Sequence, residues 1–300
     1  MMGGRAVGRS GGPWLRVLAG LLAIALGCGR RDRVVVGAKN FTESDLLAEL
    51  MAQQIERRTG LSVERRLHLG GTFVCQAAIV AGDIGIYPEY SGTAYTAVLT
   101  HPPIGDRDSV YRAVAAEYRA RFGLVWGRPF GFNNTFAILV RRGDAARYGL
   151  SRISDLASVA SRWHAAFGYE FLERADGFRG LAGVYKLTFA APPTAMDLGL
   201  TYRALADGRV DVIAGNSTDG QIAALGLLAL EDDRHYFPPY EAAPVVRTDL
   251  LERHPAIGTA LDELGGRLSD AEMRRLNADA DVRHRDITAI ARDWLRETLP

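Results

Sequence analysis

The feature that most constrains the fold is a regular alternation of short apolar strands and amphipathic helices near the start of the chain. Residues 33–38 predict a short buried strand from the three consecutive valines at 34–36, and the next segment predicts a helix from its N-cap Thr42 to a C-cap at Gly60. The alternation continues with strands expected at 61–69 and 84–87 and a helix at 72–80. Strands that alternate with helices build a mainly parallel sheet, so the chain is expected to be an α/β protein.

A second α/β unit is expected to begin near residue 132. Residues 206–215 repeat the pattern of residues 81–87, in which a helix ends at a turn, an acidic residue opens a short apolar strand and a polar segment follows. The further elements expected here are strands at 136–140 and 164–169 and helices at 153–159 and 180–185. Two similar α/β units predict two lobes with a cleft between them.

Two segments rich in Pro, Gly and Asn, residues 130–134 and 238–244, are the expected connections between the lobes. Beyond them, helical spacing is found at 249–267, 269–278 and 287–295. We therefore expect a first lobe of residues 28–131 and 241–300 and a second lobe of residues 132–240. Such a double crossover is typical of hinged proteins that close around a small solute.

The first 27 residues are expected to direct export. Residues 1–16 carry three Arg and no acidic residue, and residues 17–27 form an uncharged apolar run of signal-peptide length. The run ends in the letters ALGC, which resemble the bacterial lipoprotein processing box, although Ala25 and Leu26 stand in reversed order. The expectation is an exported protein in the periplasm or at the outer face of the cytoplasmic membrane, anchored by lipid on Cys28. A plain secretory signal is the alternative.

Composition argues against several classes of function. The chain has 36 basic and 35 acidic residues, so it has no overall attraction to nucleic acid. Cys28 and Cys75 are too few for a disulfide framework or a cysteine metal site, and Cys75 is expected in the core. The six histidines form no helical pair, and no phosphate-binding, dinucleotide-binding or nucleophile motif is present. We therefore expect no metal, no cofactor and no catalysis.

Four carboxylates and one glycine-rich turn each allow a functional and a structural interpretation. Four carboxylates could be cast as catalytic pairs but are better interpreted as strand caps and turn formers; they are Asp83, Glu89, Asp211 and Asp219. Residues 70–72 (GGT) precede a helix, where they could hold an anion or simply form a tight strand-to-helix turn.

Aromatic residues gather at loop positions around the expected cleft. They are Tyr90, Phe132, Phe136, Tyr236, Phe237 and Tyr240. Aromatic rings can hold a quaternary ammonium group, because a methylated nitrogen forms no hydrogen bonds and is attracted to the faces of the rings. Ordinary packing of aromatic residues in the core is the alternative.

Five segments, in order, resemble the substrate-binding subunit of the glycine betaine/choline (osmoprotectant) ABC transporters. They are residues 36–43 (VGAKNFTE), 69–75 (LGGTFVC), 83–93 (DIGIYPEYSGT), 217–220 (STDG) and 237–246 (FPPYEAAPVV). The resemblance implies the type II periplasmic-binding-protein fold, with two crossover hinges and a ligand cleft between the lobes. It also implies a small zwitterionic or quaternary ammonium ligand, with an ABC permease and ATPase as partners.

The resemblance assigns a ligand cage to aromatic positions of this chain. Tyr90 and Tyr240 are similar to the cage aromatics, and Phe136 lies where the family commonly has a tyrosine. The chain departs from the pattern at Asn216, where several betaine binders have a tyrosine. Losing one wall of the cage would cost about 1–2 kcal/mol of binding free energy, so the ligand could also be another small polar solute.

The resemblance also assigns groups that would meet a substrate carboxylate, namely Lys39, Thr93 and Arg174. A sensor that presents its ligand-bound form to a membrane receptor would have the same sequence features. An exported enzyme on a two-lobed scaffold is disfavoured, because the sequence has no recognisable nucleophile, base or metal constellation.

Overall fold

The computed structural model describes residues 1, 3, 4 and 33–299, so the expected leader and Cys28 lie outside the described residues. The chain divides into Met1–Arg33 and Val34–Pro300, and every helix and strand discussed below belongs to the second unit. Within the described residues, no helix combines the length and the apolar character that a membrane span requires.

The first of two five-stranded sheets contains strands from both ends of the chain. Its strands are β1 (Val34–Lys39), β2 (Val63–Gly70), β3 (Ile86–Tyr90), β4 (Leu124–Trp126) and β10 (Ala242–Arg247). They lie in the order β2-β1-β3-β10-β4, with β1 parallel to both neighbours and β10 antiparallel to both of its own. All six residues of β1 are buried. A strand buried on both faces has a continuous apolar sequence, which explains why this strand was recognisable.

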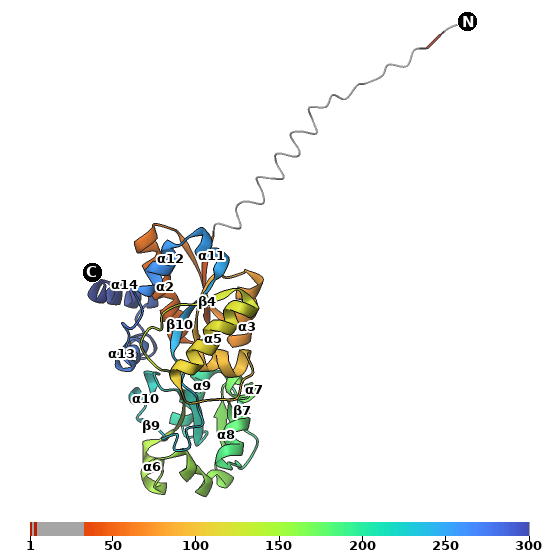
Figure 1. The fold of residues 1–300 in the computed structure, drawn as a ribbon. Coiled ribbons are helices and arrows are strands. Elements are labelled where there is room, and N and C mark those ends of the chain that lie inside the picture. Colours follow the sequence, from red (N-terminus) through yellow and green to blue (C-terminus); the bar gives the residue numbers. More distant parts are fainter. Residues whose placement is uncertain (2, 5–32, 300) are drawn as a thin grey trace. The chain divides into compact units, whose positions relative to one another are not determined.

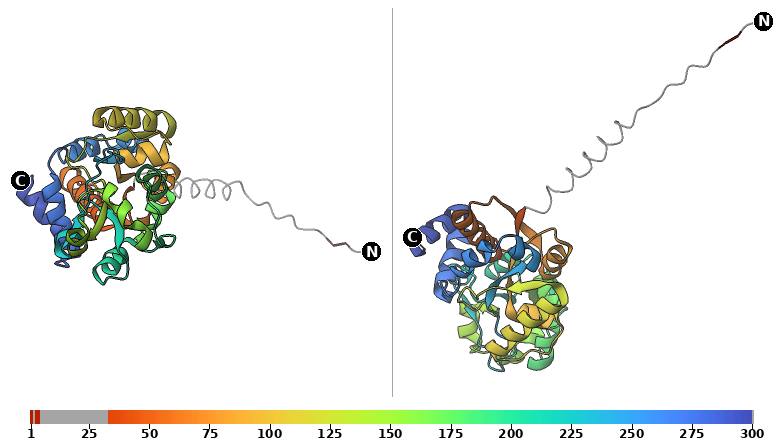
Figure 2. Two further views of the ribbon diagram at one scale, coloured as in Figure 1. Left: turned by 90° about the horizontal axis from the view of Figure 1, so that it is seen from below. Right: turned by 45° about the horizontal axis from the view of Figure 1, so that its top comes forward.

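Helices cover both faces of the first sheet. They are α2 (Thr42–Thr59), α3 (Thr72–Ala81), α4 (Ser91–Thr93), α5 (Arg107–Phe122), α11 (Thr248–Arg253), α12 (Ala256–Asp262), α13 (Asp270–Asp281) and α14 (Ile287–Thr298), and a π-helical turn at Ala94–Val98 continues α4. Side chains of α2, α12 and α14 pack on one face, and those of α3 and α5 pack on the other. The blue C-terminal helices therefore lie beside α2 (Figure 1), as two further views also show (Figure 2).

The second sheet repeats the arrangement of the first. Its strands are β5 (Phe136–Arg141), β6 (Ala165–Phe167), β7 (Thr194–Ala195), β8 (Val212–Asn216) and β9 (Leu227–Ala229), in the order β7-β6-β8-β5-β9. The helices of this lobe are α6 (Arg142–Tyr148), α7 (Tyr169–Glu173), α8 (Phe178–Tyr185), α9 (Leu198–Ala206) and α10 (Gln221–Ala224), with 3-10 turns at Ile153–Ser158 and Ala160–Arg162. The repeated sequence pattern forms β3 in one sheet and β8 in the other. Each of these strands lies between a parallel and an antiparallel neighbour.

The two chain segments that connect the lobes run side by side. Asn133 forms an antiparallel bridge with Glu241, and the Asn134 N–H donates to the Tyr240 carbonyl at 3.0 Å. The Asn133 side chain accepts a hydrogen bond from the Tyr240 N–H at 2.6 Å. These bonds bring together two segments that are more than a hundred residues apart in the sequence, at the boundary between the sheets.

Several sequence expectations were wrong in detail. The segment expected to be a linker and then a helix contains strand β10, and the expected helix 249–267 is broken at Pro255 into α11 and α12. The expected strand 164–169 is shortened to β6, because α7 begins at Tyr169. Phe41, rather than Thr42, precedes α2, and the Thr42 hydroxyl donates instead to Asp281 Oδ1 at 2.5 Å. The sequence analysis did not identify α5 and β4.

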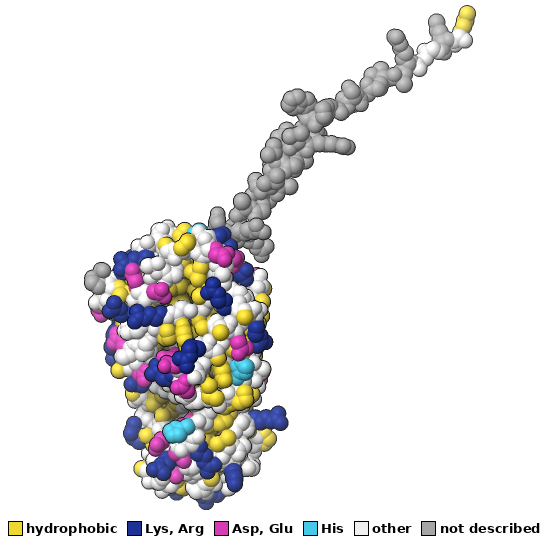
Figure 3. Space-filling view, in the orientation of Figure 1, with side chains coloured by type: hydrophobic (Ala, Val, Ile, Leu, Met, Phe, Trp, Pro, Cys, Tyr) yellow, Lys and Arg dark blue, Asp and Glu magenta, His cyan; other side chains and the backbone are white. Residues whose placement is uncertain are grey.

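The surface agrees with the balanced charge of the chain. Lys and Arg side chains are interspersed with Asp and Glu on the face drawn in Figure 3. Many of these charges form local ion pairs, such as Arg253 with Asp249 and Arg275 with Glu272. Exposed pairs of this kind contribute little to stability, typically about 0–1 kcal/mol each.

Candidate functional site

A small cavity between the lobes is lined by all seven residues that the resemblance assigned to the ligand. Its lining residues are Lys39, Phe41, Tyr90, Thr93, Asn134, Phe136, Glu170, Arg174, Asn216 and Tyr240. The space open to the centre of a water molecule is about 40 Å³, which is room for one compact chemical group. Lys39, Tyr90 and Asn216 are the last residues of β1, β3 and β8, so the cavity lies where ligands bind in open α/β sheets.

Lys39 is buried at this position together with a carboxylate. Its side chain is 2% exposed, and Nζ donates to Glu89 Oε1 at 2.5 Å and to Thr72 Oγ1 at 2.9 Å. Glu89, which we expected to cap or form a turn, lies inside β3 and is fully buried. The ion pair offsets the cost of removing both charges from water. The expected role of Glu89 was therefore wrong.

Arg174 is held by a second buried carboxylate. Arg174 Nε and Nη2 donate to the two oxygens of Asp176 at 2.9 and 2.6 Å, which is a bidentate geometry. Asp176 Oδ2 also accepts from the Thr96 hydroxyl at 2.7 Å and the Tyr240 hydroxyl at 2.6 Å. Burial raises the pKa of Asp176, but the Arg174 guanidinium outweighs it and keeps the pKa below its usual value. Asp176 thus joins the second lobe to α4 and its π-helical extension in the first.

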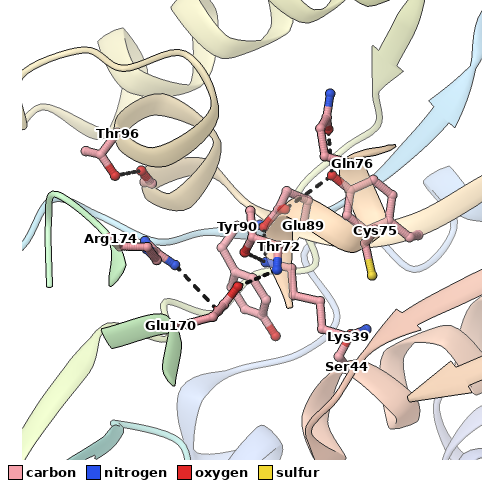
Figure 4. A network of polar contacts seen from close by, with 12 residues as sticks. Lys39, Ser44, Thr72, Cys75, Gln76, Glu89, Tyr90, Thr96, Glu170 and Arg174 are labelled. Carbon is pink, nitrogen blue, oxygen red and sulfur yellow. Dashed lines mark hydrogen bonds and ion pairs between the residues drawn. The ribbon is translucent and has the colours of Figure 1, made fainter. Parts of the chain in front are cut away.

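Glu170 reaches from α7 of the second lobe to the N-terminus of α3 in the first. Its Oε1 accepts a hydrogen bond from the Thr72 N–H, and its Oε2 lies 4.0 Å from Arg174 Nη1 (Figure 4). A Cβ atom added at Gly71 would lie 2.6 Å from Glu170 Oε1, so glycine is needed for this approach. Burial raises the pKa of Glu170, and the charges of Lys39 and Arg174 outweigh it, so that this pKa is lowered.

The glycine-rich turn before α3 therefore holds an anion, and that anion is the protein's own carboxylate. The positive end of a helix favours a negative charge at this position. Residues 70–72 also form the tight strand-to-helix turn that was the second interpretation, with Gly70 at a φ of 149°.

Three of the six aromatic residues expected at the cleft, Tyr90, Phe136 and Tyr240, line the cavity. Phe132, Tyr236 and Phe237 are not among its lining residues, and Phe132 is buried in the core of the first lobe. The hydroxyl groups of the two lining tyrosines already form hydrogen bonds. The Tyr90 hydroxyl donates to Glu43 Oε1 at 2.8 Å, and the Tyr240 hydroxyl donates to Asp176. The Phe136 and Tyr240 rings meet edge to face with their centroids 5.8 Å apart. Lys39 Nζ lies 5.1 Å from the centre of the Tyr90 ring, and Arg174 Cζ lies 5.0 Å from that of Phe136. These rings therefore already attract cationic groups of the protein.

Asn216 closes the cavity with an amide in place of an aromatic ring. Its Nδ2 lies 3.3 Å from Asp219 Oδ2, and its N–H donates to the same oxygen at 2.9 Å. Asp219 also accepts from the Tyr202 hydroxyl at 2.5 Å, and burial raises its pKa to about 7. Asp219 forms the expected turn, and Asp211 accepts the N–H of His164 before β6 at 2.9 Å.

Sequence reasoning missed the buried carboxylate of Glu43. It accepts hydrogen bonds from the side chains of Tyr90, Asn134, Thr218 and Asn277, at distances between 2.5 and 2.8 Å. These donors come from both lobes and, in Asn134, from one of the two segments that connect the lobes. Burial raises the pKa of the Glu43 carboxyl group. Glu43 belongs to the first of the five motif segments, which was the available signal. Nothing in the sequence pointed to Glu170.

A larger outer pocket adjoins the cavity and shares Phe41, Phe136, Glu170 and Asn216 with it. The space in this pocket open to the centre of a water molecule is about 250 Å³. Its other lining residues are Asn40, Gly71, Phe73, Val74, Gly168, Tyr169, Phe171, Glu173, Asp197, Leu198, Ala214 and Gly215.

Metal and thiol chemistry find no support in the described part of the chain. No group of three His, Cys, Asp or Glu side chains is placed there to hold a metal ion. Cys75 is buried in the core as expected, and burial raises the pKa of its thiol to about 12.

Two α/β lobes of matching topology, with a cavity at the strand ends between them, define a two-lobed substrate-binding protein. The chain belongs to the family described as "Substrate binding domain of ABC-type glycine betaine transport system", whose model matches residues 32–297. It is 35% identical over 289 residues to the glycine-betaine-binding protein of Pseudomonas aeruginosa, covering 93% of this chain and 91% of that protein. It is 33% identical over 274 residues to the carnitine transport binding protein OpuCC of Listeria monocytogenes, covering 91% of this chain and 89% of that protein.

A solved structure confirms the fold. The crystal structure of a glycine betaine/carnitine/choline ABC transporter protein superimposes with a TM-score of 0.73 at 32% identity, over 88% of this chain and 98% of that one. The periplasmic-binding-protein fold expected from the sequence is therefore correct. These relatives are transport binding proteins, and the chain is a substrate-binding protein rather than an enzyme.

Proposed function

We propose that the chain captures a small quaternary ammonium compound, such as glycine betaine, choline or carnitine, in the cavity between its lobes. It then delivers this ligand to the permease of an ABC importer that is driven by an ATPase. The observation that carries the proposal is that Tyr90, Phe136 and Tyr240 surround the same small cavity as Lys39 and Arg174. The related binding proteins support the same class of ligand.

The aromatic side of the cavity suits a methylated ammonium group. Ring faces attract such a cation by about 0.5–2 kcal/mol each, more where water is excluded. The hydroxyls of Tyr90 and Tyr240 donate to the carboxylates of Glu43 and Asp176, which fixes both rings. The hydroxyls are therefore occupied, and a ligand would contact these side chains through their rings, beside the cations of Lys39 and Arg174.

The polar side of the cavity keeps donors for a ligand carboxylate. An ammonium group has three N–H donors, and Lys39 uses two of them on Glu89 and Thr72. Arg174 binds Asp176 through Nε and Nη2, which leaves Nη1, at 4.0 Å from Glu170 Oε2 and so beyond hydrogen-bond distance of it. The Thr93 hydroxyl lines the same cavity. A ligand carboxylate would add to these pairs without displacing a protein carboxylate.

Titration calorimetry with glycine betaine and choline tests the proposal. Tyr90→Ala or Tyr240→Ala should weaken both ligands about tenfold or more, since each removes a ring worth about 1–2 kcal/mol. Thr93→Val should weaken glycine betaine only, because choline has no carboxylate. Tyr148→Ala, at an exposed tyrosine outside the cavity, is the matched control and should leave both affinities unchanged.

Asn216→Tyr adds a test of the missing cage wall. A ring at this position should tighten both glycine betaine and choline, by about 5- to 30-fold, because it restores a fourth face for the ammonium group. If neither compound binds the wild-type protein or this variant at millimolar concentration, the cavity serves another solute and the proposal is wrong.

We also propose that the protein is exported and held at the outer face of the cytoplasmic membrane by lipid on Cys28. The apolar run before Cys28 supports this, since it has the length of a signal peptide and ends in a cysteine. Anchoring would keep the protein close to its permease.

A further inference from the structure

The outer pocket extends the binding space well beyond what a compact headgroup needs. The inner cavity has room for one small group, whereas the outer pocket is about six times larger by the same measure, about 250 against 40 Å³. The two share four lining residues, so they lie side by side. Glycine betaine or choline would leave the outer pocket to water.

The rim of the outer pocket exposes large apolar side chains from both lobes. Phe73 and Val74 of α3 in the first lobe are 51% and 50% exposed, and Tyr169 of α7 in the second lobe is 59% exposed. Exposed apolar residues are unremarkable when scattered, but here three line a single pocket that continues into the binding cavity. An apolar group bound there would remove their surfaces from water and would contact both lobes.

The charges of the outer pocket all have one sign. Its lining includes the carboxylates Glu170, Glu173 and Asp197, and none of the described residues that line it is Lys, Arg or His. A neutral or cationic group is therefore compatible with this pocket, and an anionic group is repelled.

Asn216 is one of the residues between the two spaces. It lines both of them, at the end of β8, where its short amide takes up less room than a ring would. A tyrosine at this position would place a ring between the inner cavity and the outer pocket. The departure from the family pattern thus has a positive consequence in addition to the lost ring face.

We propose that the preferred ligand is a quaternary ammonium compound that carries an apolar arm without negative charge, such as an aromatic ring. Its ammonium group lies in the inner cavity, and its arm passes Asn216 into the outer pocket. This inference rests on the proposed function, because it assumes that the inner cavity holds the ammonium group. It makes Asn216 and Phe73 determinants of specificity.

A series of three betaines with the same headgroup and carboxylate isolates the arm. The probes are the trimethylbetaines of glycine, phenylalanine and glutamate, which carry no arm, an aromatic arm and an anionic arm. Calorimetric titration of the full-length mature protein should show phenylalanine betaine binding at least about tenfold more tightly than glycine betaine. Glutamate betaine should bind more weakly than glycine betaine.

Two substitutions then locate the arm. Phe73→Ala should weaken phenylalanine betaine about fivefold or more and leave glycine betaine within about twofold. Leu200→Ala is the matched control, because Leu200 is 54% exposed but lies on α9 outside the outer pocket. Asn216→Tyr should affect the two ligands in opposite directions, tightening glycine betaine and weakening phenylalanine betaine, because the ring completes the cage and blocks the passage.

The outcomes separate this inference from the function on which it rests. If glycine betaine binds and phenylalanine betaine binds no better, the inference is wrong and the proposed function stands. The same holds if Phe73→Ala leaves phenylalanine betaine unchanged, or if Asn216→Tyr tightens both ligands alike. If neither betaine nor choline binds, the proposed function and this inference are both wrong.

Discussion

Tyr240→Phe tests how far one buried hydroxyl stabilises the protein. The Tyr240 hydroxyl donates to Asp176 Oδ2 at 2.6 Å, and both residues are almost fully buried. A buried hydrogen bond to a charged group contributes about 1.5–3 kcal/mol. Asp176 keeps its two bonds from Arg174 and one from Thr96. We therefore expect the substitution to lower the free energy of unfolding by about 2 kcal/mol, measured by urea denaturation without ligand.

Tyr236→Phe is the matched control for this measurement. The Tyr236 hydroxyl donates to neutral carbonyl oxygens of Ala175 and Gly177, both at 3.3 Å, and Tyr236 is only partly buried. Its loss should lower the unfolding free energy by less than about 0.5 kcal/mol. The reasoning would be refuted if the two substitutions lowered the unfolding free energy equally, or if Tyr240→Phe lowered it by less than about 0.5 kcal/mol. The Tyr240 ring stays in place because it packs against Gly92, where an added Cβ would lie 2.7 Å from Cδ1.

Two further predictions concern Asp219 and Cys28. Burial raises the folded-state pKa of Asp219 to about 7. The folded protein therefore binds the proton of the Asp219 carboxyl group more tightly than the unfolded chain does. The contribution of Asp219 to the free energy of unfolding consequently falls as pH rises from about 4 to 7. The free energy of unfolding of Asp219→Asn, measured by urea denaturation, should therefore rise relative to that of the wild type by up to about 1.4 kcal/mol per pH unit in that window. A difference between the two proteins that does not change with pH would contradict this. Cys28→Ser should release the protein into the soluble fraction with ligand binding unchanged, because the lipid attachment site is lost. If the wild-type protein is itself soluble and begins at another residue, the anchor is wrong.

Strands were predictable from the sequence where burial alone determined their composition. β1 is buried on both faces and is therefore a continuous apolar run. β10 was missed, although it lies in the middle of the same sheet, because proline is normally excluded from a central strand. Pro244 of β10 lies opposite Pro88 of β3, so the two missing N–H groups coincide at one position of the pairing. Only the three-dimensional pairing reveals this arrangement.

Near the C-terminus, the sequence predicted one helix where the structure has two, α11 and α12. Apolar residues keep helical spacing through 249–267, and Leu250, Ile257 and Leu261 are all buried in one core. The periodicity therefore continued across Pro255, where the backbone bends and α12 begins. Periodicity indicates which face is buried, and it does not indicate whether the helix is continuous.

The cations at the cavity could be found from the sequence, and most of the carboxylates that balance them could not. Lys39 lies in the first of the five motif segments and Arg174 was assigned by the resemblance, whereas Glu170 reaches Thr72 across 98 residues of sequence. Around the cavity these two cations meet three carboxylates, Glu89, Glu170 and Asp176. Negative charge therefore exceeds positive charge there, and this excess favours a cationic group over an anionic one. Because the pair of Lys39 and Glu89 comes from the first lobe and the carboxylates that pair with Arg174 come from the second, this charge balance forms only in the folded protein.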